Sequence, residues 1–301
     1  MIRLVLRFLS IGLLISIATS EVAAKNIAES YDPEAVYLSC KSELDRILHL
    51  SNTRFESDGH QYTTYLVARM AGYNVSEAYV LSYYSQYPDL NLKYSATWVS
   101  IIHLLNPFTQ KWRSDITGVL HSLHGGDNIS VERRRKDLSN AVRGQLSISP
   151  LQYQQAGLII HSFGDSFAHT KNAYKTPEEK AYGTFIGHAL DLHEPDQVAR
   201  SDVFEKYSAY VTHLFHALNI QGNGNEKALM DYIENLRPLV CDDDCSTREI
   251  KNMSKAIKSF GKNEGSFSDD IYRCIKSNSP HLDKDEIQSA INTVKSLHSE
   301  H

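Results

Sequence analysis

The sequence lacks most features that assign a chain to a common class at once. It has no G-x-S-x-G stretch and no adjacent His-Asp pair, which argues against serine hydrolases and against metal-dependent phosphohydrolases defined by that doublet. Its formal net charge of −5 leaves no excess of Lys and Arg for a nucleic-acid surface. After the N-terminus, no segment approaches the roughly 20 apolar residues of a transmembrane helix. No repeat and no Pro-, Gly- or Ser-rich linker divides the chain.

The N-terminus has the pattern of a secretory signal peptide. Arg3 and Arg7 precede an apolar run from Phe8 to Ala18, and small residues follow where such leaders are cleaved. The apolar run is too short to span a bilayer. We therefore predict a signal peptide over residues 1–24, no transmembrane anchor, and a secreted or periplasmic mature protein.

Four cysteines remain in a chain that we expect to enter an oxidising compartment. They form an even set, Cys40, Cys241, Cys245 and Cys274, which favours disulfides and leaves three pairings open. The stretch CDDDC, residues 241–245, could instead be a metal loop. Disulfides are the preferred interpretation, because three of the cysteines lie in the last quarter of the chain, away from the histidines and aspartates considered below.

Hydrophobic periodicity predicts an all-α protein, since no stretch alternates convincingly as a strand would. Asn74 and Glu77 have capping-box spacing, Ser149-Pro150 offers a cap residue and a first-turn proline, and Thr176-Pro177 repeats that signal. Helices are expected after Asn74, after Thr176, and at residues 34–50, 59–72, 95–105, 130–146, 151–169, 201–219, 225–236, 247–260 and 284–298.

The chain beyond the signal peptide is expected to be one helical, bundle-like domain, residues 25–301. Its functional core would lie at residues 55–200. The segment QGNGN, residues 221–225, is typical of a loop, and we expect it to precede a C-terminal helical extension over residues 221–301.

The stretch GLIIHSFGDSFAHT, residues 157–170, places polar side chains at regular spacing within an apolar run. His161, Asp165 and His169 are four residues apart, so on a helix each is turned by only about 40° from the previous one. Imidazole nitrogen and carboxylate oxygen on one face commonly bind zinc, at about 2.0–2.2 Å. For this triple alone, buried histidines satisfied by hydrogen bonds are an equally good interpretation.

More histidines and aspartates lie in the same part of the chain, most of them beside aromatic or apolar residues. They are His60, Asp89, His103, His121, His124, His161, Asp165, His169, His188, Asp191, His193 and Asp196. Buried polar groups need partners, and so many cannot easily satisfy one another. A centre of several metal ions, placed between helices, would satisfy them together.

In its order of ligand-type residues, the chain resembles the zinc-dependent phospholipase C and fungal single-strand nuclease superfamily. The motifs in order are His60 opening HQYTTYLVARMAGY, Asp89 after SYYSQYP, a later histidine, His161-x3-Asp165, His169 and Gly187-His188. The resemblance implies a helical bundle with zinc ions at the base of a cleft, and cleavage of phosphodiester bonds.

The resemblance also implies roles for particular residues. Asp89 matches an acid at the metals that is often the general base, and Asp165 matches a carboxylate that bridges two zinc ions. The other implied metal ligands are His60, His161, His169 and His188.

One more ligand in the middle of the chain has three candidates. His103 has the family's spacing after the acid. His124 stands where a helix ends, beside Gly125-Gly126, which permits close backbone approach. We favour His124 slightly, with His121 as the third choice.

Three departures from the family pattern limit what the resemblance implies. Position 192 is Leu where the family has an acid, so Asp191, His193 or Asp196 would have to substitute. The family's N-terminal Trp ligand is missing after residue 24, and His169 follows Asp165 sooner than in the phospholipases. Two zinc ions are therefore a safer expectation than three.

These observations favour an exported zinc-dependent phosphodiester hydrolase acting on a phospholipid. The acidic net charge makes phospholipid the first choice and a nuclease or nucleotidase the second. The missing acid at position 192 supports a third interpretation, an exported metal-binding protein without activity. The oligomeric state is not indicated by the sequence.

Overall fold

Two long helices, α4 (Val75–Leu90) and α8 (Tyr153–Ala168), form the centre of the protein. The computed structural model describes residues 32–44, 58–102, 107–148, 152–183, 197–242, 244–263 and 265–299. In these ranges, regular strand structure is confined to the two-residue strands β1 (Thr170–Lys171) and β2 (Lys180–Ala181), which pair antiparallel. The predicted all-α class and single domain are confirmed.

Close packing of α4 against α8 follows from the composition of α8. Every residue from Ala156 to Phe167 is buried, including the polar His161 and Asp165, so this helix is surrounded by other elements on all sides. Gly157 lies at the crossing, where an added Cβ would come within 2.5 Å of the Tyr84 Cβ. The glycine therefore sets how near the two helices approach.

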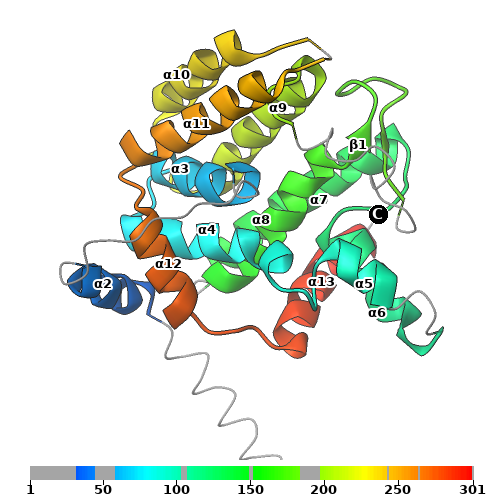
Figure 1. Cartoon of the computed structure of the whole chain (residues 1–301). Coiled ribbons are helices and arrows are strands. Elements are labelled where there is room, and N and C mark those ends of the chain that lie inside the picture. Colours follow the sequence, from blue (N-terminus) through cyan, green and yellow to red (C-terminus); the bar gives the residue numbers. More distant parts are fainter. Residues whose placement is uncertain are drawn as a thin grey trace, which may run out of the picture.

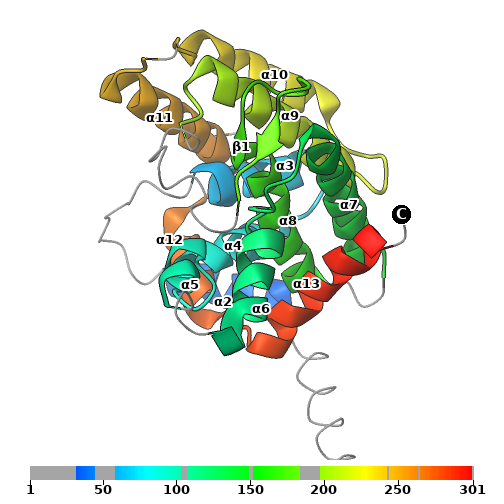
Figure 2. The same cartoon turned by 90° about the vertical axis from the view of Figure 1, so that its right-hand side faces the viewer.

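The remaining helices surround this pair, with α10 and α11 at one end and α5 and α6 towards the other (Figures 1 and 2). In chain order they are α2 (Pro33–Leu44), η1 (Asp58–Tyr62), α3 (Thr63–Met70), α5 (Ala96–Ile102), η2 (Pro107–Thr109), α6 (Gln110–Ser114), η3 (Asp115–Leu120), α7 (Asn128–Ser147), α9 (Ser201–Leu218), α10 (Glu226–Leu236), η5 (Arg237–Leu239), α11 (Thr247–Asn263), α12 (Asp269–Asn278) and α13 (Lys284–Ser299).

The predicted helix start signals have different outcomes. The capping box before α4 is confirmed, since the Asn74 side chain accepts from Glu77 N–H and the Glu77 carboxylate accepts from Asn74 N–H. The helix start at Thr176-Pro177 is wrong, because turns there lead into β2 and Glu179 turns inward to a buried position. Ser149-Pro150 lies outside the described residues, and α8 begins at Tyr153.

Both cysteine pairs form disulfides, as preferred from the sequence. Cys40–Cys274 joins α2 to α12, and Cys241–Cys245 closes a short loop after η5, each with a Cα separation of 5.6 Å. The CDDDC stretch is therefore not a thiolate metal loop.

The predicted signal peptide, residues 1–24, lies outside the described residues. Among the helices that are described, none combines the length and the hydropathy needed to cross a bilayer.

Candidate metal centre

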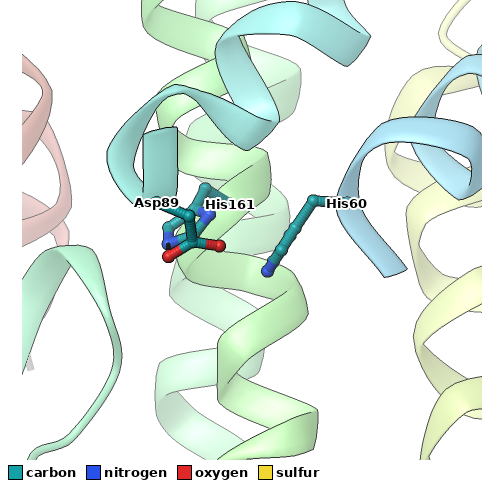
Figure 3. A group of neighbouring side chains, drawn as sticks. All are labelled: His60, Asp89 and His161. Carbon is teal, nitrogen blue, oxygen red and sulfur yellow. Dashed lines mark ion pairs between the residues drawn. The ribbon is translucent and has the colours of Figure 1, made fainter. Parts of the chain in front are cut away.

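Six of the predicted site residues converge in the described part of the chain. They are His60 on η1, Asp89 near the end of α4, His121 directly after η3, His161 and Asp165 on α8, and His169 at the end of α8. Figure 3 shows His60, Asp89 and His161 pointing towards one another from three separate helical elements. Residues more than 100 positions apart in the sequence therefore share one site.

Asp165 is the residue on which the cluster centres. Its Oδ2 lies 3.1 Å from His121 Nδ1 and 3.2 Å from His161 Nε2, and its Oδ1 lies 3.1 Å from His60 Nε2. Burial alone would raise the pKa of Asp165, but the charges of His169 and His161 and the hydrogen bonds of the imidazoles hold it well below its usual range. Asp165 is therefore a buried carboxylate that remains ionised.

Backbone carbonyls fix the tautomers of two histidines. His161 Nδ1–H donates to the Ser85 carbonyl over 2.8 Å, and His121 Nε2–H donates to the Tyr94 carbonyl over 2.8 Å. Without an ion, protonated rings can donate from His121 Nδ1 and His161 Nε2 to Asp165 Oδ2. In the neutral form that metal binding requires, each of these two nitrogens carries a lone pair. Such outer hydrogen bonds are typical of metal-ligating histidines, because they orient the ring and raise its basicity.

The two lone-pair nitrogens face each other. His121 Nδ1 and His161 Nε2 are 3.0 Å apart, and both lie beside Asp165 Oδ2. Neither neutral nitrogen can donate to the other, so a cation between them would satisfy all three atoms. Donors at about 2.0–2.1 Å from a tetrahedral zinc are separated by about 3.3 Å, close to the spacing found here.

His169 adds a third ring held by a carbonyl. Its Nδ1–H donates to the His121 carbonyl over 2.9 Å, and the same nitrogen lies 3.6 Å from Asp165 Oδ2. The side chain of His169 and the backbone of His121 are thus fixed relative to each other.

Asp89 is the exposed member of the cluster, with 40% of its side chain accessible. Its Oδ1 lies 3.9 Å from His161 Nε2 and 4.0 Å from His121 Nδ1, while its Oδ2 accepts from Gln86 Nε2–H at 3.1 Å. The site therefore opens to solvent on the Asp89 side.

His60 completes a second possible ion position. Ligand atoms of His60, Asp89 and His161 lie within 4.8 Å of one another, as do those of His121, His161 and Asp165. The buried Nδ1 of His60 has no hydrogen-bond partner in the structure. The two groups share His161, whose one remaining nitrogen can bind a single cation, so a second ion would rely on His60 and Asp89.

Two π-helical segments deliver ligand-type residues to this cluster. His60 lies within η1, and His121 is the residue at the C-terminal end of η3. π-Helical turns are rare and are frequently found at functional sites. They change the direction of side chains that ordinary helical spacing would place elsewhere.

Gly164 leaves room for His60, and its replacement is expected to disturb the site. A Cβ at Gly164 would come within 3.0 Å of His60 Cε1, whereas a Cβ at Gly144 on α7 meets nothing within 4 Å. We expect Gly164→Ala to weaken metal binding at least about tenfold, because the ring of a candidate ligand is displaced. Gly144→Ala should leave metal binding unchanged and raise stability by about 0.5–1 kcal/mol. Zinc titration and thermal unfolding of both variants measure these effects, and equal zinc affinity in both would contradict the role of Gly164.

The structure changes which histidine we prefer as the further metal ligand among His103, His121 and His124. His121 lies in the cluster, whereas His124, which we favoured, is outside both groups of ligand atoms, and its Nδ1 accepts from Gly126 N–H at 3.2 Å. His121 therefore replaces His124 in the site considered below. The candidates that lie outside the described residues are His103, His188, Asp191, His193 and Asp196.

The fold and the site together define an all-α protein with a buried histidine and carboxylate cluster. Residues 55–118 match the model of a family of unknown function (DUF6765). The matched stretch includes His60 and Asp89 and ends before His121. No curated protein and no solved structure matches the chain.

Proposed function

We propose that this protein is an exported zinc-dependent phosphodiester hydrolase with a phospholipid as its substrate. The observation that carries the proposal is the convergence of His121 Nδ1, His161 Nε2 and Asp165 Oδ2 within 3.0–3.2 Å of one another, with the outer nitrogens tied to carbonyls. Neutral imidazoles and an ionised carboxylate are the donors that zinc prefers.

In the proposal, the site holds two zinc ions. His121, His161 and Asp165 would hold one ion, and His60 with Asp89 would hold a second beside it. When bound, paired zinc ions supply Lewis-acid activation of a phosphate ester and of the attacking water. This chemistry suits hydrolysis of a phosphodiester, whose negative charge the ions would offset.

Asp89 supplies both the general base and the side on which substrate can reach the site. Asp89 is the one exposed carboxylate of the cluster, and Gln86 holds its Oδ2 so that Oδ1 is directed at the nitrogen atoms of the site. In the proposal, the Asp89 carboxylate accepts the proton of the attacking water through the oxygen that does not bind the second ion, while buried Asp165 keeps the histidines in place. The substrate phosphate would approach from the solvent-exposed side of Asp89.

Replacing Asp89 by Asn is expected to separate catalysis from folding. The amide cannot accept a proton at neutral pH, so kcat should fall about 10²- to 10⁴-fold, while the ion held by Asp165 remains. Asp202→Asn is a matched control, because the Asp202 side chain on α9 is 41% exposed and lies outside the cluster. Initial rates with bis(p-nitrophenyl) phosphate and with phosphatidylcholine, together with zinc content, provide the measurements.

The substrate panel also separates the proposal from its alternatives. Hydrolysis of single-stranded DNA with no hydrolysis of phospholipid would indicate the nuclease function instead. Zinc-loaded protein that cleaves no phosphodiester in the panel would favour the metal-binding protein without activity. Full activity in Asp89→Asn would rule out Asp89 as the base.

A further inference from the structure

Exposed apolar side chains gather in one segment next to the candidate metal centre. Among the described residues, eight large apolar side chains are exposed, and four of them fall between positions 90 and 108. Their exposed fractions are 43% for Leu90, 60% for Leu92, 46% for Trp98 and 96% for Phe108. We call these four residues the apolar rim. The two tryptophans of the chain, Trp98 and Trp112, also lie in this region.

Leu90 and Leu92 of the apolar rim lie in the segment that borders the opening of the site. Leu90 follows Asp89 directly, and the carbonyl of Tyr94, two residues after Leu92, accepts the hydrogen bond of His121. Helices α5 and α6, on either side of Phe108 in the sequence, lie near each other at the end away from α10 and α11 (Figures 1 and 2).

Ring contacts connect the two halves of this region in space. Tyr94 and Trp112 have ring centroids 6.3 Å apart, and Lys284 Nζ lies 4.9 Å from the centre of the Trp112 ring. The contact of Tyr94 with Trp112 is made below the surface, since Tyr94 is buried, and it places the segments around Leu92 and Trp112 next to each other, with the start of α13 beside them.

The charge of the region differs from that of the whole chain. Residues 90–113 contain Lys93, Lys111 and Arg113 and no Asp or Glu, in a chain of net charge −5. Lys93 and Lys111 are exposed. Two acids, Asp283 and Glu286, approach Tyr94 from the beginning of α13, so the surface is weakly rather than strongly basic.

We propose that the apolar rim docks on a phospholipid surface and brings the Asp89 opening to the lipid head groups. Tryptophan and leucine side chains beside lysines are the composition of an interfacial lipid-binding surface, since the rings enter the head-group region and the ammonium groups meet phosphates. The inference rests on the proposed function, because docking would serve to bring the site to its lipid substrate. Docking itself needs no catalysis, and it can be measured on metal-free protein.

Intrinsic fluorescence is a specific probe here, because both tryptophans belong to the region. Metal-free protein is mixed with vesicles of phosphatidylcholine, or of phosphatidylcholine with phosphatidylglycerol, and vesicle sedimentation is measured in parallel. We expect a blue shift and co-sedimentation with both, stronger with phosphatidylglycerol. Leu92→Ser and Phe108→Ser should each lower the partition coefficient at least about tenfold. Met230→Ser, which removes an exposed side chain on α10, should not change it.

Three results would overturn the inference. These are no sedimentation with either vesicle, equal sedimentation of Phe108→Ser and wild type, or a concentration-dependent dimer in gel filtration that Phe108→Ser abolishes, which would assign the rim to a second copy of the chain. Docking that is present while zinc-loaded protein hydrolyses no lipid would instead refute the proposed function and leave the docking surface standing.

Discussion

Asp165→Asn is expected to abolish zinc binding while the protein stays folded. Oδ2 of Asp165 lies beside the lone pairs of His121 and His161, and Oδ1 lies beside His60. An asparagine amide can donate hydrogen bonds to those lone pairs, so the folded state without metal loses little. The same amide supplies no charge and no bridging oxygen for the ions. We therefore expect zinc affinity to fall by more than about 100-fold, beyond the loss typical of an outer partner.

The measurement is elemental analysis of the purified mature protein after dialysis against zinc, with circular dichroism of the same samples. Asp115→Asn is the matched control, because Asp115 is also buried and charged but pairs with Lys295 on α13. The control should lose stability and keep its zinc. Two zinc ions per chain in wild type and in Asp165→Asn alike would place the metal elsewhere, and no zinc in wild type would remove the reason for proposing an enzyme.

Local periodicity predicted the central part of the candidate site. The four-residue spacing of His161, Asp165 and His169 placed them on one face of a helix, and in the structure Asp165 contacts both histidines at that spacing. The resemblance to zinc-dependent phospholipases added His60 and Asp89, which the fold brings to the same place. Their convergence depends on how η1 and α4 pack against α8, which no local pattern reports.

The choice between His121 and His124 could not be made by counting along a helix. η3 is a π-helix, in which each residue turns by a smaller angle about the axis than in an α-helix. The direction of the His121 side chain therefore differs from the one that α-helical spacing would give. The feature that selects His121 is its hydrogen bond to the Tyr94 carbonyl, a contact between segments 27 residues apart. Long-range contacts of this kind are absent from the sequence pattern.

Two further differences between the helices expected from the sequence and those in the structure have local physical causes. Helix α12 begins at Asp269, with Ser268 capping the Ile271 N–H, and it was not predicted because its apolar face is short and follows a glycine-containing loop. The stretch after Thr176-Pro177 has a good helix-start signal, yet the buried carboxylate of Glu179 accepts from Lys175 N–H and holds the chain in a turn. Tertiary burial of one charged side chain outweighed the local preference there.

The second large effect is expected in Glu179→Gln, because this substitution removes the buried carboxylate. We expect the free energy of unfolding to fall by about 3–5 kcal/mol. Arg135 on α7 donates to both Glu179 oxygens, at 2.6 and 3.1 Å, and its guanidinium lies 4.3 Å from the centre of the Phe167 ring. The Thr170 hydroxyl donates to the same carboxylate. Glutamine would leave the buried guanidinium with only the part-exposed Glu132 as a counter-charge, and urea unfolding of metal-free protein measures the cost.

Glu132→Gln tests whether burial is the cause. Glu132 also pairs with Arg135, at 2.6 Å, but its side chain is 43% exposed, so its replacement should cost less than about 1 kcal/mol. A loss in Glu132→Gln as large as that in Glu179→Gln would show that the charge of Arg135, and not the burial of the pair, sets the effect.

Acidification should reduce the difference between wild type and Glu179→Gln. Burial by itself would raise the pKa of Glu179, but the hydrogen bonds and charge of Arg135, with those from Lys175 N–H and Thr170, hold it below the usual range. A carboxyl group whose pKa is lowered by folding stabilises the protein above its unfolded pKa of about 4.3, and this contribution is lost as the pH falls through the folded value. Unfolding free energies of the two proteins should therefore differ most at neutral pH and converge below about pH 4. A difference that stays constant down to pH 3 would mean that the Glu179 carboxylate does not carry the stabilisation.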